Sequence, residues 1–309
     1  MVEQFVKQHI VPQRYLQRFA AHKTNGAGYY IGVRKVKGHD VLLYKQSISN
    51  VAFVRNIYDD KLKSDPKHWE HLFSRQYEPL YGKPIDRVCS KALLSTSGRK
   101  ILTDDEKHLI GKLIAVQYMR VPSFLYRQQK TGNQIGADIA KEVRMKFGEK
   151  LPKDKRHAVD RICYNPNSIK SIMMSLTTDQ NRINAYADLI ADHVMTVVYN
   201  NTAIPFFTSD NPVILYNLYK GSMDYDDCGM ARADTIIFYP LSSKVLIQAF
   251  PRAMLTNKGI RSDCERIVIN SDETGYLIVV NGLQFRHAWQ ESFCPPDFID
   301  LVKQQQTML

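Results

Sequence analysis

Four short polar motifs contain the residues of this chain that could perform chemistry. The first is His9, which precedes Pro12; proline suits the first turn of a helix, so the imidazole would lie at a helix N-terminus. The helix dipole there favours a neutral imidazole, the form that acts as a general base or a metal ligand. The alternative is a structural role, in which His9 bonds a backbone carbonyl and fixes the path of the chain.

The second motif is Ser209-Asp210-Asn211-Pro212. Pro212 favours an extended conformation at Asn211, which places Asp210 at the end of a predicted strand. A carboxylate beside an amide could bind a hard cation or act as a general base, with Asn211 orienting the substrate. The same residues also favour an Asx-type turn, in which Asp210 or Ser209 bonds its own backbone. The sequence leaves both roles open.

The third and fourth motifs are a Gln/Arg pair and an isolated carboxylate. Gln117 and Arg120 are three residues apart, so they share one face of a helix that ends near Pro122. Arg120 could clamp a phosphate bidentately, or it could bind the last carbonyls of its own helix. Glu78 lies among the apolar residues of segment 77–81, where a carboxylate is either paired with an arginine or part of a site.

The net charge indicates which partners are plausible, and the absence of known motifs argues against several enzyme classes. The 309 residues include 42 Lys and Arg against 31 Asp and Glu, a net charge of +11, which favours nucleic acid or a nucleotide as partner. There is no GxxxxGK[ST], no GxSxG and no GxGxxG after a predicted strand. These absences argue against P-loop hydrolases, α/β-hydrolases and dinucleotide-binding enzymes. Zinc-finger and RNP motifs are absent as well.

Cysteines and apolar runs bear on the compartment. The five cysteines are isolated, which argues against a disulfide framework and against a cysteine-built zinc site and favours a reducing cytoplasm. No apolar run approaches the ~20 residues of a spanning helix, and the N-terminus lacks a signal-peptide core. We therefore expect a cytoplasmic protein without membrane contact.

The elements that must position the four motifs predict an α+β fold. Residues 29–35 and 41–45 flank a glycine-containing turn and predict an N-terminal β-hairpin. Residues 66–193 show helical spacing, and a capping box at Thr103 and Glu106 opens the helix that ends near Arg120. We predict strands at 194–199, 204–208, 213–216, 235–239 and 245–250, a turn at 239–243 and a last helix at 298–304. The C-terminal part is thus a mostly antiparallel sheet with terminal helices. We expect one domain, 1–309, with a sub-boundary near 193 between a hairpin and helical block (1–193) and a β-rich block (194–309).

Together these motifs resemble a bacterial domain-of-unknown-function family, the one numbered 4238. The resemblance rests on segments 9–19, 117–122, 206–213 and 238–242 and on Asn270, in this order, and covers residues 5–290. The family often has a tryptophan ahead of the Ser-Asp-Asn-Pro strand, where this chain has His193 and Val194. The resemblance implies no activity, because the family has none established; it favours a helix over a strand for residues 270–283.

We interpret the four motifs as parts of a site for a phosphate-containing substrate. The leading hypothesis is a metal-dependent nuclease of a bacterial defence or toxin type, with Mg²⁺ or Mn²⁺ as metal. Its acid-base and metal-binding side chains would be His9, Asp210 and Glu78, with the metal held by Asp210 and His9. Its substrate-binding side chains would be Arg120, Gln117 and Asn211. The alternative is a non-catalytic binding or sensor protein whose polar motifs are structural. The sequence leaves open whether the protein is an enzyme, and it gives no oligomeric state.

Overall fold

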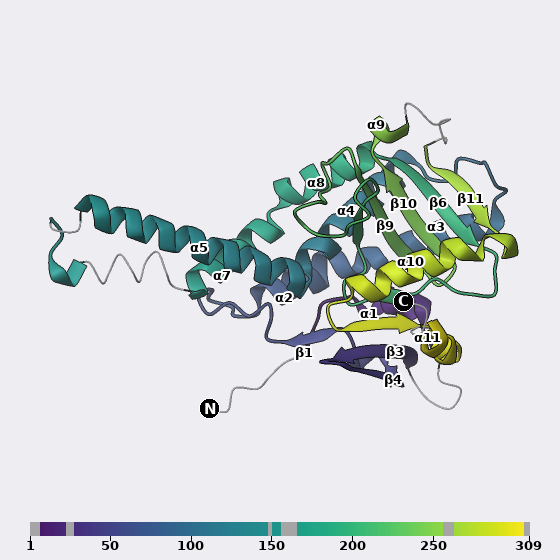
Figure 1. The fold of residues 1–309 in the computed structure, drawn as a ribbon, viewed down its shortest axis with the longest axis horizontal. Helices are drawn as coiled ribbons and strands as arrows, with labels where there is room; N and C mark the ends of the chain where they lie inside the picture. Colours follow the sequence, from purple (N-terminus) through teal and green to yellow (C-terminus); the bar gives the residue numbers. More distant parts are fainter. Residues whose placement is uncertain (1–6, 23–27, 148–149, 156–165, 256–262, 306–309) are drawn as a thin grey trace.

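The computed structural model describes residues 7–22, 28–147, 150–155, 166–255 and 263–305 and has the predicted α+β architecture (Figure 1). The N-terminal part consists of short elements and a hairpin: β1 (Lys7–His9), α1 (Gln13–Leu16), η1 (Gln17–Phe19), β2 (Ala21–His22), β3 (Tyr29–Lys37), β4 (Asp40–Ser47), η2 (Ile48–Asn50) and β5 (Phe53–Arg55). The middle is helical: α2 (His68–Leu72), η3 (Phe73–Tyr77), η4 (Glu78–Tyr81), α3 (Lys83–Leu94), α4 (Asp104–Arg120), α5 (Pro122–Phe147), α7 (Pro166–Thr178) and α8 (Gln180–Asp192). The C-terminal part is mixed: β6 (Val194–Asn200), β7 (Thr208–Ser209), β8 (Ile214–Asn217), β9 (Thr235–Ser242), β10 (Val245–Phe250), α9 (Arg252–Leu255), β11 (Glu265–Ile269), η5 (Ser271–Glu273), α10 (Thr274–His287), β12 (Glu291–Cys294), η6 (Pro296–Phe298) and α11 (Ile299–Gln305).

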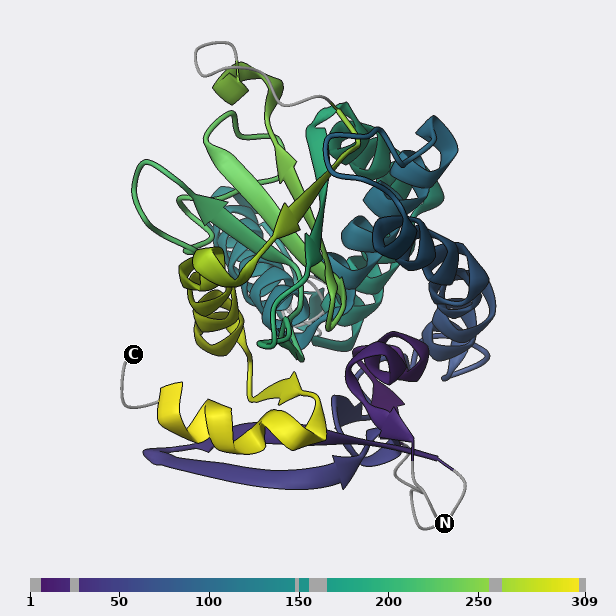
Figure 2. The same ribbon diagram turned by 90° about the vertical axis from the view of Figure 1, so that its right-hand side faces the viewer.

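The main sheet has the strand order β11-β6-β10-β9-β8. β11 runs parallel to β6, and the other pairs are antiparallel. Side chains alternate between its faces, as the pleat of a strand requires. Val197 of β6 belongs to the core that includes Leu113 of α4, whereas its neighbour Val198 packs in the cluster with Leu277 of α10. The sheet is therefore covered on one face by α10 and on the other by the central helices (Figure 2).

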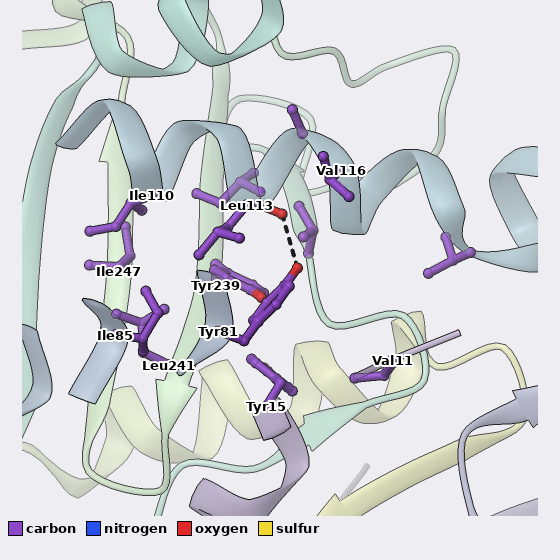
Figure 3. Packing of buried hydrophobic residues seen from close by; sticks show 14 of the residues in the cluster. Val11, Tyr15, Tyr81, Ile85, Ile110, Leu113, Val116, Tyr239, Leu241 and Ile247 are labelled. Carbon is purple, nitrogen blue, oxygen red and sulfur yellow. Dashed lines mark hydrogen bonds between the residues drawn. The ribbon is translucent and has the colours of Figure 1, made fainter. Parts of the chain in front are cut away.

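An aromatic cluster joins the N-terminal helix to the sheet and to α4. The rings of Tyr15 and Tyr239 stack with centroids 5.5 Å apart, and Tyr81 meets Tyr15 edge-on at 6.1 Å. The Tyr15 hydroxyl lies 2.6 Å from the Pro240 carbonyl, to which it donates, and the Tyr81 hydroxyl donates to the Leu113 carbonyl at 3.4 Å (Figure 3). The buried hydroxyls of Tyr15 and Tyr81 thus have partners, and the cluster fixes the N-terminal segment against β9 and α4.

A second sheet joins the two ends of the chain. Its strand order is β2-β3-β12-β7. Strand β4 pairs with β3 along the edge of β3 that faces away from β12. Strand β12 lies between β3 and β7 and is antiparallel to both. Gly32 of β3 faces Cys294 of β12 so closely that a Cβ at Gly32 would lie 2.7 Å from the Cys294 sulfur. The N-terminal hairpin is therefore held by strands from the C-terminal part.

Several predicted elements are confirmed. The hairpin 29–47, the block of helices and the predicted strands at 194–199, 213–216, 235–239 and 245–250 are present. The capping box is present too, because Glu106 N–H donates to the Thr103 hydroxyl at 3.2 Å and Thr103 N–H donates to the Glu106 carboxylate at 2.9 Å. Residues 274–287 are helical, as the family resemblance implied.

Two predicted elements are wrong. Of the predicted strand 204–208 only Thr208 is in a strand, because the side-chain oxygen of Asn281 on α10 accepts the Phe207 N–H and takes the place of a strand partner. The turn predicted at 239–243 is also wrong. β9 continues through Pro240 to Ser242, with an irregular register opposite Val245 and Leu246, so the chain reverses after Ser242.

From the sequence we also expect no disulfide framework and no membrane-spanning helix. Cys89, Cys228, Cys264 and Cys294 are free thiols, and Cys163 lies outside the described residues. Within the described ranges, no helix combines the length and the apolar character that crossing a bilayer needs.

Candidate functional site

Arg120 is the centre of a buried polar cluster at the end of α4. Its guanidinium has no exposed surface. It donates to the His9 carbonyl at 2.6 Å, to the Tyr58 hydroxyl at 3.3 Å and to the Glu78 carboxylate at 3.2 Å. It also lies over the Phe73 ring, 4.6 Å from the centroid. A charge without access to water is stabilised by such contacts, so Arg120 ties four segments of the chain together.

Gln117 lies one turn before Arg120 and bonds the same segment. Its amide nitrogen donates to the Ile10 carbonyl at 2.9 Å, and its amide oxygen is 3.4 Å from the Tyr81 hydroxyl. The three-residue spacing does place Gln117 and Arg120 on one face, as expected. In this conformation their shared target is the backbone of His9 and Ile10. The end of α4 therefore clamps the chain just before α1.

The imidazole of His9 lies at the edge of this cluster. Strand β1 pairs with β5, which sets His9 opposite Phe53. Burial lowers the pKa of His9, the Glu78 carboxylate opposes this effect, and the Arg120 charge adds to it. His9 is therefore neutral at pH 7. Glu78, whose side chain is 29 % exposed, is its carboxylate neighbour. This pair has the composition of an acid-base couple.

Glu70 is a member of the cluster that the sequence interpretation missed. Burial raises the pKa of Glu70, the Arg120 charge lowers it, and the Glu78 carboxylate raises it further. In the described part of the chain, one carboxylate oxygen of Glu70 and one terminal nitrogen of Arg120 are buried without a hydrogen-bond partner. The signal was the spacing of eight residues between Glu70 and Glu78, two turns along a helical segment, but nothing in the sequence indicated Arg120 as the shared neighbour.

Asp210 belongs to a second polar cluster, in the connection between α10 and β12. Its carboxylate accepts three backbone N–H groups, from Trp289 at 2.7 Å and from Gln290 and Glu291 at 2.8 Å each. The side chain is 2 % exposed. Burial raises the pKa of Asp210 to about 7, against the opposing effect of the three N–H donors. The carboxylate thus acts as the cap of this connection.

Asn211 bonds the same connection. Its side-chain nitrogen donates to the His287 carbonyl at 3.2 Å, and its backbone N–H donates to the Ser209 hydroxyl at 3.3 Å. The second bond is the local turn that the sequence offered as the alternative for Ser209. Burial lowers the pKa of the His287 imidazole to about 4. Asn211 is therefore buried beside an imidazole that stays neutral at pH 7.

A polar chain links the two clusters through Glu291. The carboxylate of Glu291 accepts the Ala52 N–H at 3.0 Å, and its backbone N–H donates to Asp210. The Ala52 carbonyl in turn accepts the Ile10 N–H at 2.9 Å. Ala52 has a φ of 49°, which is a strained backbone conformation for a residue with a side chain. The hydrogen bonds of its N–H and of its carbonyl hold it in this conformation. The structure thus brings His9, Glu78, Gln117 and Arg120 together, while the contacts of Asp210 and Asn211 are with the α10–β12 connection.

A metal site was part of the sequence hypothesis. Among the residues that the structure describes, no group of three or more His, Cys, Asp or Glu side chains could hold a metal ion. Three N–H donors already occupy three of the about four lone-pair sites of the Asp210 carboxylate. The pairing of Asp210 with His9 around Mg²⁺ or Mn²⁺ therefore stays a prediction.

An open cleft of about 300 Å³ lies beside the start of α5 and was not anticipated. Arg127 lies 3.1 Å from the centroid of the Tyr225 ring and 5.6 Å from that of Phe124, and it donates to the Tyr118 hydroxyl at 3.5 Å. Arg182 of α8 also lines the cleft. Its guanidinium lies 5.9 Å from the ring centroid of Tyr186, four residues further along the same helix. Burial raises the pKa of Tyr118 to about 12, so its hydroxyl stays a hydrogen-bond donor. The cleft combines two guanidinium groups with aromatic rings; the residues that carry this character are Tyr118, Phe124, Arg127, Arg182, Tyr186 and Tyr225.

The comparisons with known proteins give a family and no activity. A family model described as a protein of unknown function (DUF4238) matches residues 7–291, so the chain belongs to this family. The searches of the curated proteins and of the solved structures gave no match.

Proposed function

We propose that this member of the DUF4238 family is a non-catalytic binding protein and that its ligand is one nucleotide unit, bound in the cleft between α5, α8 and the loop at 225–230. The observation that carries the proposal is the guanidinium of Arg127 set among the rings of Tyr225 and Phe124 in an open cleft. Aromatic rings and arginine planes are the surfaces on which nucleobases stack, and arginine is the side chain that best matches a phosphate.

The size and polar groups of the cleft suit a mononucleotide. Its volume of about 300 Å³ is at the lower end of small-molecule sites. Arg127 and Arg182 supply two permanent positive charges for a phosphate. Asp226 also lines the cleft, and a carboxylate there suits ribose hydroxyls, which donate hydrogen bonds. The net charge of +11 increases the rate at which such anions approach.

Binding is favoured over catalysis because the predicted catalytic side chains are engaged in the fold. Arg120, proposed as the phosphate clamp, is fully buried and bonded to backbone and side-chain partners. Asp210, proposed as base or metal ligand, caps the α10–β12 connection. In the cleft, by contrast, the polar and aromatic groups face an open volume.

The test is the affinity for a fluorescein-labelled single-stranded RNA of about ten nucleotides, with AMP as competitor. We expect wild-type protein to bind the RNA and AMP to displace it. Arg127→Gln should weaken both probes at least about tenfold, because it removes a charge-assisted phosphate contact and a stacking surface. RNA binding that AMP does not displace would assign the ligand to a strand rather than to a free nucleotide.

The matched control is Arg87→Gln. Arg87 is an exposed arginine of α3, so this variant makes the same change of net charge away from the cleft. Equal weakening in the two variants would attribute binding to net charge and would contradict the proposal.

The nuclease hypothesis keeps one supporting observation: burial lowers the pKa of His9, and the Glu78 carboxylate is close enough to oppose that effect. It predicts that labelled RNA or DNA is cleaved in the presence of Mg²⁺ or Mn²⁺ and that His9→Asn abolishes cleavage while the protein still folds. The binding proposal predicts intact nucleic acid with both proteins. Cleavage by wild type alone would replace the binding proposal with the nuclease.

A further inference from the structure

A second, separate pocket of about 280 Å³ lies on the other flank of α5. From α5, the cleft described above is lined by Phe124, Arg127 and Gln128, whereas this pocket is lined by residues 125, 126 and 129. Its other walls are one face of α7 and residues 55–57, which are Arg55 at the end of β5 and the two residues that follow it. We propose that this pocket binds a small apolar carboxylate, with Lys170 as the cation that holds the carboxylate. This proposal is independent of the proposed nucleotide site.

The apolar wall of the pocket is formed by side chains that point to a common volume. Lys170, Met173 and Met174 have the spacing i, i+3 and i+4, so they share one face of α7. Leu125 faces them from α5, and Ile57 closes the pocket from the segment after β5. Thioether side chains adapt to differently shaped ligands, so this wall fits an aliphatic chain or a single aromatic ring.

The ammonium of Lys170 is the polar feature of this wall. Lys170 is half-buried, and burial lowers the pKa of its ammonium. Its hydrogen bond to the Asn56 carbonyl is long, at 3.4 Å. Asn56 has a φ of 54°, in the left-handed region. An ammonium has three N–H donors, so a carboxylate in the pocket would compensate the desolvated charge directly.

Two nearby acids could compete with such a ligand, but each has partners of its own. The charges of Asp59 and Asp60 both raise the pKa of Lys170. Asp59 accepts the side-chain N–H of Gln8 at 2.6 Å. Asp60 accepts the indole N–H of Trp69 at 3.1 Å and the Leu62 N–H at 2.9 Å. Asp60 also accepts a hydrogen bond from Ser171 of α7. Both carboxylates are therefore engaged by other donors, and they attract the ammonium without forming a contact ion pair with it in the described structure.

The helices α5 and α7, which form two walls of the pocket, pack closely against each other next to it. A Cβ at Gly132 of α5 would lie 2.8 Å from the Ile169 side chain of α7. Glycine therefore allows the two helices to approach each other at Ile169, the residue before Lys170. A site with preformed walls binds a small ligand without ordering a loop, which favours binding of a ligand of this size.

The test is an NMR titration of protein labelled with ¹³C-methyl methionine, using octanoate as the probe and octan-1-ol as its uncharged match. We expect octanoate to shift the methyl resonances of Met173 and Met174 saturably at concentrations up to about 10 mM. Lys170→Met should weaken octanoate at least about tenfold, because it removes the charge-assisted bond and keeps the apolar wall. It should leave the affinity for octan-1-ol unchanged, which also establishes that the variant is folded.

A control separates this proposal from the nucleotide cleft. Arg127→Gln should bind octanoate like wild type, since Arg127 lines the other side of α5. The proposal is overturned if octanoate leaves both methionine resonances unchanged, if octan-1-ol binds as tightly as octanoate, or if Lys170→Met retains wild-type affinity for octanoate. Loss of octanoate binding in Arg127→Gln alone would place the carboxylate in the cleft and would also overturn it.

Discussion

Arg120 and Arg127 are seven residues apart, on either side of Pro122, and have opposite surroundings. Both guanidinium groups lie over aromatic rings, Phe73 for the first and Tyr225 for the second. Arg120 is fully buried and bonded to a carbonyl, a hydroxyl and a carboxylate. Arg127 is only partly buried and lines an open cleft.

The difference shows that residue type and aromatic contact do not by themselves define a binding site. A buried arginine whose donors are engaged stabilises the fold, and removing it leaves its partners unpaired. An arginine in an open cleft has donors for a ligand and contributes little to stability. The same distinction separates Asp210, which caps a connection, from the carboxylate of Asp226 at the cleft.

The largest effect is expected for Arg120→Met. The variant removes the bonds to the His9 carbonyl and to Glu78 and should lower the free energy of unfolding by about 3–5 kcal/mol. Urea unfolding followed by circular dichroism measures this loss. Arg127→Met should lose less than about 1 kcal/mol in the same experiment. Similar losses for the two variants would remove the distinction between the two arginines.

The second prediction concerns the pH dependence that Asp210 gives to stability. Burial raises the pKa of Asp210 to about 7 in the folded protein, against about 3.9 in an unfolded chain. Between these values the folded state binds the extra proton, so the contribution of Asp210 to stability is full below about pH 4 and is lost as the pH rises to about 7. Its size is on the order of a few kcal/mol.

Unfolding of wild type and Asp210→Asn across this pH range tests the prediction. The unfolding free energy of wild type minus that of Asp210→Asn should fall as the pH rises, because Asp210 titrates and the amide does not. A difference that grows with pH would mean that the three N–H donors outweigh burial and that Asp210 is a charged cap.

A third, smaller effect is expected for Gln117→Leu. It removes the bond to the Ile10 carbonyl and should lower the unfolding free energy by about 1–2 kcal/mol. The matched variant is Gln128→Leu, which makes the same change at the cleft and should alter stability by less than about 0.5 kcal/mol. Thermal unfolding of the pair checks this; equal melting temperatures would show that α4 does not clamp the segment at Ile10.

The smallest effect is expected for Tyr225→Leu. It removes a stacking surface of the cleft and should weaken AMP by about five- to tenfold, equivalent to about 1 kcal/mol. Competition against labelled RNA measures it. Unchanged affinity would assign the base to a surface other than the Tyr225 ring and would leave Arg127 as a phosphate contact only.

The parts of the fold predicted from sequence are those with local causes. The capping box of Thr103 and Glu106, the glycine turn of the hairpin and the apolar spacing of the helices all act within a few residues. The failures have distant causes. Phe207 leaves the strand pattern because its N–H meets the side chain of Asn281, and the short strand β12 exists only through pairing with β3 and β7.

The same division holds for the candidate sites. The spacing of Gln117 and Arg120 predicts that they share a face, but not that they face carbonyls more than 100 residues earlier in the chain. The cleft was missed because Tyr225 lies in an acidic loop whose sequence indicates only a solvated surface. Its approach to Arg127 depends on how that loop packs on α5, which no local pattern encodes.

The most direct test of the account is the affinity for AMP of two folded variants, Glu78→Gln in the buried cluster and Arg127→Gln in the cleft. Glu78→Gln removes one charge from the buried cluster around Arg120, and Arg127→Gln removes one charge from the cleft. We predict that Glu78→Gln binds AMP like wild type and that Arg127→Gln binds AMP at least about tenfold more weakly. Loss of AMP binding in Glu78→Gln, with Arg127→Gln unaffected, would place the functional site at the buried cluster of His9, Glu78 and Arg120 and would contradict the account.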